Sequence, residues 1–342
     1  MSGGVVRFVT GALLMLLLTF TVAGRMNAQG NHLRLMFYNV ENLFDTEDDT
    51  LRDDDQFLPG GSMRWHYGRY ERKINALYKT IIAAGEGAPP DIVALCETEN
   101  KQVLRDIIYH SGMLKYNYGI IHNDSPDPRG IDVCVLYRKK IVSVMHYHYF
   151  LPDDIKQSDH PTRNVMYVKC VAMNDTLHLF VNHWPSRRGG VISGRERRQK
   201  IAEMIKDKID SIASAEKNDP RIIITGDFNT TPDDRVFDLF TNDNGSGPLF
   251  VNLSGISDRG SGTYKYKGIW DMPDQMFVSL SLLKKINGFY TEPGLLKIFS
   301  PGFLLQDDPL YPGKKPFPTF AGYRYSGGYS DHLPLLLDLR VR

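Results

Sequence analysis

Acids, amides and imidazoles stand at the ends of apolar, β-rich runs throughout this chain. In RIIITGDFN (221–229), β-branched residues predict a buried strand, and Asp227 and Asn229 follow it. One polar residue at such a place is usually a turn former or a cap. Its recurrence indicates groups that line one cleft, because strand ends at one edge of a sheet converge. The other groups of this kind are Asn39, Glu97, Asp132, His183, Asp274, Asp331 and His332.

Such a set suits metal-assisted attack of water on a phosphate. A hard divalent cation binds one or two carboxylates together with waters and phosphate oxygens. Glu97 and Asp331 supply carboxylates for it, and Asn39 supplies a neutral oxygen. Asp227 is the candidate base that orients or deprotonates the water, with Asn229 beside it on the same face.

The two histidines are the candidates to face the phosphorus. A charge-bearing donor stabilises the negative charge that develops on the phosphate oxygens, and His183 and His332 are the natural choices. A carboxylate such as Asp274 would orient one imidazole and raise its pKa.

Strands must position most of these groups, with helices between them at irregular intervals. Apolar periodicity predicts helices over 65–84, 101–112 and 193–214. Short turns between neighbouring strands favour antiparallel pairing, for example of 166–172 with 177–184. Two sheets packed face to face with helices outside account for the pattern. The predicted strands are 33–40, 91–97, 131–138, 166–172, 177–184, 221–229, 274–279 and 333–341.

The motifs, taken in order, resemble the endonuclease/exonuclease/phosphatase superfamily, which includes deoxyribonuclease I. The resemblance runs from about residue 33 to 341, and GDFN with SDH carries most of its specificity. It implies an α/β fold, a four-layer sandwich of two mostly antiparallel sheets, with a Mg2+- or Mn2+-dependent phosphoesterase site at one end; Ca2+ is a further candidate ion. The motifs are YNVEN (38–42), ALCETEN (94–100), RGIDVCVLY (129–137), NHWPSR (182–187), GDFNTTP (226–232), DQMFVS (274–279) and SDHLP (330–334).

The resemblance implies roles for individual residues. Asn39 and Glu97 help to bind the metal, and Asp331 lies near it. Asp227 positions or activates the water and Asn229 assists. By the same resemblance, His183 and His332 contact the phosphate, and Asp274 orients His332. Asp274 fits the family strand better than Asp271 does.

Arginines near these motifs are further candidates to bind a substrate phosphate, since a guanidinium binds phosphate with two parallel hydrogen bonds. Arg187 and Arg188 follow His183 closely, and Arg129 precedes Asp132 by three residues. Asp132 joins this substrate group without a defined role, because family members vary there. The alternative for Arg187 and Arg188 is a solvated loop.

The first residues are typical of a secretory signal peptide. Arg7 precedes an apolar run from about Val9 to Val22, and small and polar residues follow. We predict a cleaved signal over 1–28, cut after Ala28, and one catalytic domain over 29–342. The run is short for a membrane anchor, which needs about 20 residues. The mature protein is then exported, periplasmic or secreted, without stable membrane insertion. The three cysteines are interpreted as buried thiols.

Three functions fit these features. The first is an exported phosphodiesterase, chiefly an endo- or exonuclease, which acts as a monomer on a phosphodiester substrate such as nucleic acid. The second is a hydrolase of lipid or small phosphates, similar to sphingomyelinases or inositol phosphatases. The third is a catalytically silent binding protein. A net charge of +1 argues against bulk-charge coating of nucleic acid and leaves a local basic groove open. The acid-rich stretch 45–55 would repel a polynucleotide if it bordered the cleft.

Overall fold

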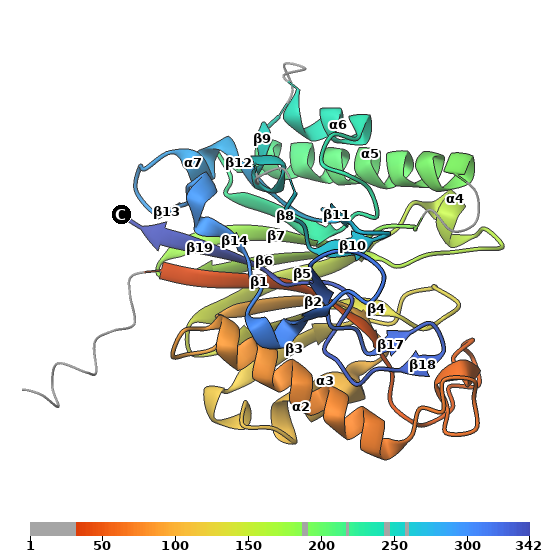
Figure 1. Cartoon of the computed structure of the whole chain (residues 1–342). Helices are drawn as coiled ribbons and strands as arrows, with labels where there is room; N and C mark the ends of the chain where they lie inside the picture. The colour runs from red at the N-terminus through yellow and green to blue at the C-terminus, as the bar shows by residue number, and fades with distance from the viewer. Residues whose placement is uncertain (1–31, 187–190, 217–218, 243–246, 257–259) are drawn as a thin grey trace, which may run out of the picture. The chain divides into compact units, whose positions relative to one another are not determined.

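Two β-sheets pack face to face with helices on their outer faces, which makes a four-layer α/β sandwich (Figure 1). This computed structural model describes residues 32–186, 191–216, 219–242, 247–256 and 260–342. Leu33 to Arg342 form one compact unit. The predicted signal peptide at 1–28 lies outside the described residues, so its cleavage stays a prediction. In the described part of the chain, no helix is long and apolar enough to span a bilayer.

The seven-stranded sheet has the order β13-β19-β1-β2-β4-β3, and β14 also pairs with β19. Strands β1 and β2 run parallel, whereas β2–β4 and β3–β4 are antiparallel. The strands are β1 (His32–Leu43), β2 (Ile92–Thr98), β3 (Tyr118–His122), β4 (Asp132–Arg138), β13 (Phe289–Tyr290), β14 (Leu296–Ile298) and β19 (Leu335–Val341).

The six-stranded sheet has the order β5-β6-β7-β8-β12-β9. Strands β6 and β7 are antiparallel neighbours, which confirms the predicted pair, and β7 and β8 run parallel. Each sheet thus contains a parallel pair beside antiparallel ones. The strands are β5 (Val142–Phe150), β6 (Val165–Ala172), β7 (Asp175–His183), β8 (Ile222–Asp227), β9 (Phe250–Asn252) and β12 (Asp274–Ser279).

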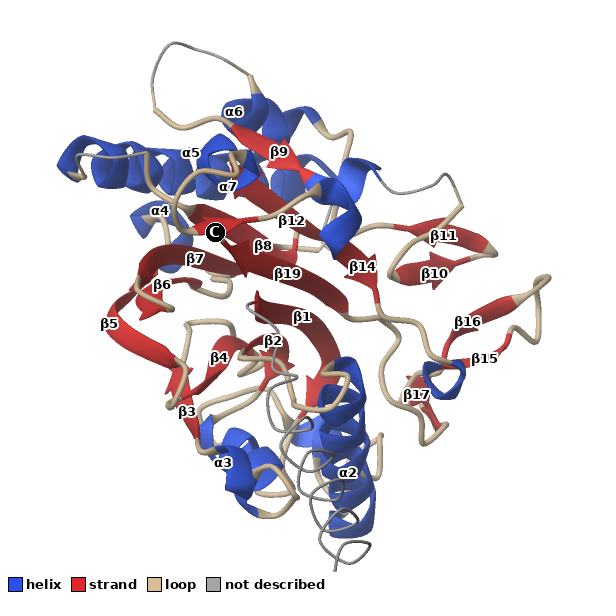
Figure 2. Ribbon diagram, turned by 90° about the vertical axis from the view of Figure 1, so that its left-hand side faces the viewer, coloured by secondary structure: helices blue, strands red, loops and turns tan. Residues whose placement is uncertain are grey.

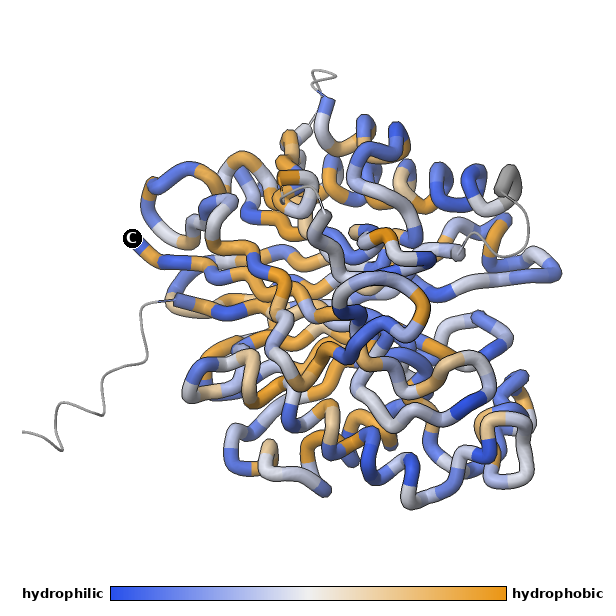
Figure 3. Tube along the Cα trace, in the orientation of Figure 1, coloured by the Kyte–Doolittle hydropathy of each residue, from blue (hydrophilic) through white to orange (hydrophobic). Residues whose placement is uncertain are grey.

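Three apolar clusters hold the four layers together. Hydrophobic residues are concentrated along the central strands (Figure 3). The central cluster joins the facing sides of the sheets, for example Phe37 and Leu179. The second packs helices α2 and α3 on one sheet, and the third packs α5 and α6 on the other. Burial of these apolar faces is the main favourable term in the stability of such a fold. The helices are α2 (Tyr67–Ala84), α3 (Lys101–Tyr109), α4 (Asp153–Lys156), α5 (Val191–Ala215), α6 (Asp238–Thr241) and α7 (Leu280–Leu283).

The long Gly-, Pro- and Tyr-rich stretch at 284–329 contains several short strands. Hairpin β15–β16 lies beside hairpin β10–β11 (Figure 2). Strand β5 was not predicted: it is a sheet edge with many exposed residues, so its sequence lacks the alternation of a half-buried strand. Cys96, Cys134 and Cys170 are free and buried, as predicted. The small hairpin strands are β10 (Tyr264–Tyr266), β11 (Ile269–Asp271), β15 (Leu305–Asp307), β16 (Lys314–Pro316), β17 (Phe320–Ala321) and β18 (Arg324–Tyr325).

Candidate active site

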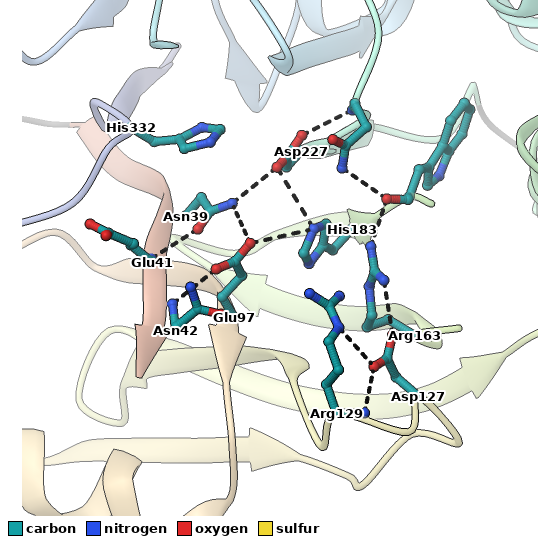
Figure 4. Close-up of polar contacts among 12 residues, drawn as sticks. Asn39, Glu41, Asn42, Glu97, Asp127, Arg129, Arg163, His183, Asp227 and His332 are labelled. Carbon is teal, nitrogen blue, oxygen red and sulfur yellow. Dashed lines mark hydrogen bonds and ion pairs between the residues drawn. The ribbon is translucent and has the colours of Figure 1, made fainter. Parts of the chain in front are cut away.

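The parallel strand pairs bring polar side chains from both sheets to one end of the sandwich (Figure 4). In the first sheet, Asn39 pairs with Cys96, the residue before Glu97. In the second, His183 pairs with Asp227. Parallel strands end at the same sheet edge, so each pair delivers two functional groups side by side.

Asn39 connects the two sheets directly. Its Nδ2 donates to Asp227 Oδ2 at 3.0 Å and to Glu97 Oε1 at 3.3 Å. Its Oδ1 accepts a hydrogen bond from the Glu41 backbone N–H at 3.0 Å, which fixes the orientation of the amide. Asn39 therefore presents nitrogen to the carboxylates in this arrangement, and its predicted role as an oxygen ligand of a metal stays a prediction.

Asp227 has the environment of a base that works near neutral pH. The carboxyl is buried, and loss of hydration followed by repulsion from Asp274 raises its pKa to about 7. Its Oδ1 accepts a hydrogen bond from the Asn229 backbone N–H at 2.9 Å. A base with a pKa near the working pH combines the correct protonation state with driving force for proton transfer.

Two residues at the end of β8, Gly226 and Asn229, meet special requirements of the backbone. Asn229 adopts a left-handed φ of 52°, and its Nδ2 donates to the Trp184 carbonyl at 2.9 Å. Asparagine tolerates this backbone region better than most residues. Gly226 is required for a different reason: an added Cβ would lie 2.4 Å from the Asn182 carbonyl oxygen on the neighbouring strand. The backbone of β8 therefore approaches β7 closely at this position.

His332 and Asp274 form a buried, hydrogen-bonded pair, with Nδ1 2.6 Å from Asp274 Oδ2. Burial alone lowers the pKa of His332, but the attraction of the Asp274 carboxylate outweighs it and raises the pKa well above the ordinary value. The Thr263 hydroxyl donates to the same carboxylate oxygen. The imidazole is thus held as a cation at neutral pH, in the orientation that Asp274 sets.

His183 has the opposite character. It is buried, with Nε2 3.7 Å from Asp227 Oδ2 and 3.8 Å from Glu97 Oε1. Burial, and then the cations Arg163 and Arg129, lower the pKa of His183 well below its ordinary value. Among the described residues, its Nδ1 has no hydrogen-bond partner. His183 is therefore a neutral imidazole that offers either a donor or an acceptor to a bound group.

Glu97 and Asp331, the two carboxylates predicted to bind the metal, are close enough to interact electrostatically. Glu97 has a left-handed φ of 64°, and the Asn42 backbone N–H donates to its Oε2 at 2.9 Å. Burial raises the pKa of Asp331, and the nearby Glu97 carboxylate adds to that effect. Two mutually repelling carboxylates bind a divalent cation favourably. Asp227, Asp274 and His332 also offer ligand atoms within 4.8 Å of one another, although the Asp274–His332 hydrogen bond already uses two of their atoms.

An arginine network that the sequence only partly indicated lies beside His183 (Figure 4). Arg129 Nε lies 3.4 Å from Asp127 Oδ1. The buried Arg163 donates to Asp127 Oδ2 at 2.9 Å and to the Trp184 carbonyl at 2.7 Å. Asp127 and Arg163 were not among the predicted site residues. The turn residues DSPDPRG (124–130) are the only sequence signal for this network, since Arg163 lies 36 positions from Asp127.

Asp132, Arg187 and Arg188 are the remaining residues that were predicted to contact the substrate. Asp132 is buried at the start of β4, where Oδ1 accepts a hydrogen bond from the Ser125 backbone N–H at 2.9 Å and Oδ2 lies 3.2 Å from His122 Nε2. Its carboxylate thus faces the turn after β3, and contact with substrate stays a prediction. Arg187 and Arg188 lie outside the described residues.

Comparisons with known proteins identify the family and agree with the fold. A family model described as "Endonuclease/Exonuclease/phosphatase family" matches residues 34–341. Humanized D. rerio TDP2 has a TM-score of 0.56 at 15% identity, covering 91% of this chain and 100% of that one. The endonuclease/exonuclease/phosphatase from Bacteroides vulgatus has a TM-score of 0.55 at 16% identity, covering 91% and 99%.

The human Nocturnin catalytic domain with bound sulfate has a TM-score of 0.53 at 16% identity, covering 92% of this chain and 96% of that one. At such identities the structural likeness concerns the fold. No curated protein sequence matches the chain. Since the family model spans nearly all of the described residues, the chain belongs to the endonuclease/exonuclease/phosphatase family.

Proposed function

We propose that this protein is an exported, divalent-metal-dependent phosphodiesterase that cleaves a P–O bond by attack of water. One observation carries the proposal: a buried carboxyl with a pKa of about 7, Asp227, lies between a neutral imidazole and a cationic one. Activation of water requires a base, and stabilisation of the phosphate requires a cationic hydrogen-bond donor close to that base.

The residues divide the chemistry as follows. Asp227 accepts the proton of the attacking water, and the Asn229 N–H holds its carboxylate in place. The His332 imidazolium donates a hydrogen bond to a phosphate oxygen, with Asp274 fixing the ring. A cation held by Glu97 and Asp331 would neutralise charge on the phosphate. Mg2+ or Mn2+ suits these oxygen ligands.

Polynucleotide is the first substrate class that we propose. A structure of D. rerio TDP2 in complex with single-strand DNA product has a TM-score of 0.55 and 15% identity with this chain. Arg129 is partly exposed beside His183, which suits a phosphate next to the scissile one. Binding of a polynucleotide is then expected to weaken steeply with salt concentration.

A specific observation favours a smaller substrate as the second candidate. The stretch 45–55 is largely exposed and acidic, and it contacts the turn that carries Arg129. In that contact, the Asp53 backbone N–H donates to the Pro128 carbonyl at 2.8 Å. Negative charge at this border repels a long polyanion more than it repels a lipid headgroup or an inositol phosphate.

A substrate panel with Mg2+, Mn2+ and Ca2+ tests both candidates. Plasmid, single-stranded DNA, RNA, phospholipid vesicles, inositol phosphates and a chromogenic diester are compared, with Asp227→Asn as the inactive variant and the exposed Asp233→Asn as its matched control. Cleavage of lipid or inositol phosphate with intact plasmid would refute the nuclease proposal. No metal-dependent hydrolysis of any substrate, with Asp227→Asn indistinguishable from wild type, would favour a silent binding protein. Export is tested by sequencing the N-terminus of the mature protein.

A further inference from the structure

Lys73 is a buried lysine on α2 that contacts a segment far away in the sequence. Its side chain is 2% exposed. Nζ donates to Thr319 Oγ1 and to the Tyr329 carbonyl, both at 2.6 Å, across 246 and 256 positions of sequence. A buried ammonium is unfavourable unless hydrogen bonds and opposite charges compensate for its lost hydration. Lys73 therefore depends on the position of the 317–330 segment, and the segment depends on Lys73.

Glu41 holds the same segment from the other side. It lies two residues after Asn39, is buried, and has a left-handed φ of 52°. Its two carboxylate oxygens accept hydrogen bonds from the backbone N–H groups of Thr319 and Phe320, at 2.6 and 2.9 Å. Each carboxylate oxygen thus accepts a hydrogen bond from a backbone N–H group of the segment, so Glu41 fixes the position of Thr319 and Phe320.

The segment that these residues hold ends at the site. Within it, the Tyr329 and Ser330 backbone N–H groups donate to the Phe317 carbonyl at 2.7 and 3.2 Å. Ser330 Oγ then donates to the Asn39 carbonyl at 2.7 Å and accepts a hydrogen bond from the His332 N–H at 3.1 Å. A displacement near Thr319 or Tyr329 would therefore move Asp331 and His332 relative to Asn39.

Lys73 lies close to two acids, Glu41 and Asp331, with which its ammonium interacts favourably. Burial raises the pKa of Glu41 to about 8, and repulsion from Asp331 adds to this, while the Lys73 ammonium opposes both. Burial also raises the pKa of Asp331, where His332 and Lys73 are the opposing cations. The Lys73 ammonium thus attracts both neighbouring carboxyl groups, in addition to its hydrogen bonds to Thr319 and Tyr329.

We propose that Lys73 and Glu41 are positioning residues that clamp the 317–330 segment between α2 and β1 and so set the placement of Asp331 and His332. The proposal rests on the proposed function only in taking those two residues as site groups. It concerns a contact between the helical layer and the site, in which Lys73 and Glu41 act through the segment that they hold.

Hydrogen exchange measured by mass spectrometry tests the clamp without substrate or metal. Lys73→Met removes both hydrogen bonds from the segment, so amides in 318–332 should exchange at least about tenfold faster, given the strength of charged hydrogen bonds. Peptides that cover β8 should be unchanged. The matched control is Lys79→Met on the same helix, whose exposed ammonium contacts the Tyr329 hydroxyl at 3.2 Å; its 318–332 amides should behave as in wild type.

Two results would overturn the proposal. Unchanged exchange in 318–332 would mean that Lys73 does not hold the segment, and equal acceleration in β8 would mean that it stabilises the fold as a whole. If Lys73→Met does not fold, Thr319→Val removes the Oγ1 acceptor and keeps the lysine; faster exchange in the segment supports the clamp and unchanged exchange overturns it.

A kinetic measurement separates positioning from a general structural role. On a cleaved diester, Lys73→Met should lower kcat about tenfold or more with little change in KM, because the placement of the catalytic groups changes and the substrate contacts do not. A change confined to KM would contradict the proposal. If wild type cleaves no phosphoester, the proposed function fails, and the exchange experiment still decides on the clamp.

Discussion

The two site histidines should change the pH dependence of stability in opposite directions. Burial and two nearby arginines hold the pKa of His183 well below its ordinary value of about 6.5, so below that pH the unfolded chain binds a proton that the folded one does not. Stability is then present above pH 6.5 and is lost as pH falls. From the unfolded pKa alone, the loss reaches about 2 kcal/mol at pH 5.

His332 contributes with the opposite sign. Asp274 holds its pKa well above the ordinary value despite burial, so its contribution is fully present below pH 6.5 and is lost as pH rises. At pH 8 the loss is again about 2 kcal/mol, from the same relation. In wild type the two losses are therefore equal at pH 5 and pH 8, and they cancel in the difference in stability between these two pH values.

Urea unfolding at pH 5, 6, 7 and 8 with EDTA present measures these contributions as differences from wild type. In His183→Asn, the stability at pH 5 relative to pH 8 should rise by about 2 kcal/mol, and in His332→Asn it should fall by about the same amount. The exposed His148→Asn is the control and should leave the profile unchanged. Shifts of the same sign in both site variants, or shifts below about 0.5 kcal/mol, would refute the assigned charge states.

Three further substitutions test other parts of the structure. Asp227→Asn should lower turnover by about 100-fold or more while Mn2+ binding, followed by electron paramagnetic resonance, persists; retained activity would exclude Asp227 as the base. Gly226→Ala should lower stability by about 1–3 kcal/mol, because the new Cβ would meet the Asn182 carbonyl oxygen; an unchanged melting temperature would contradict this packing. Phe228→Ala should cost about 3–5 kcal/mol in urea unfolding, since the ring is fully buried; a loss below about 1 kcal/mol would show that the core collapses around the gap.

Much of the site could be predicted because its chemistry is confined to short motifs at strand ends. Residue type pointed to Asp227, Asp274 and the two histidines, and strand convergence predicted that they meet. The pairing of Asp274 with His332 followed from the family resemblance. Helix α2 was predicted to start at residue 65 and starts at Tyr67, because apolar periodicity reports a buried face better than it reports an end. The four-layer fold followed from the same pattern with the family resemblance.

The contacts that the sequence did not reveal depend on side-chain direction or on long range. The Asn39 amide could present either atom to the acids, and only the Glu41 N–H decides between them. Lys73 looked like one more charged residue on a helix, since its partner Thr319 is 246 positions away. Parallel pairing of β1 with β2 was also missed, because short turns elsewhere favoured antiparallel sheets.

The order of the site groups along the chain has a consequence during synthesis. Asn39 leaves the ribosome first and His332 last, and 332 − 39 = 293 residues separate them. At ribosomal speeds of roughly 5–20 residues per second, about 15 to 60 s pass between the two events. The segment that Lys73 and Glu41 hold also arrives in that last stretch. A growing chain therefore carries Asp227 without its cationic partner His332, and the candidate site is complete only after residue 332 has been synthesised.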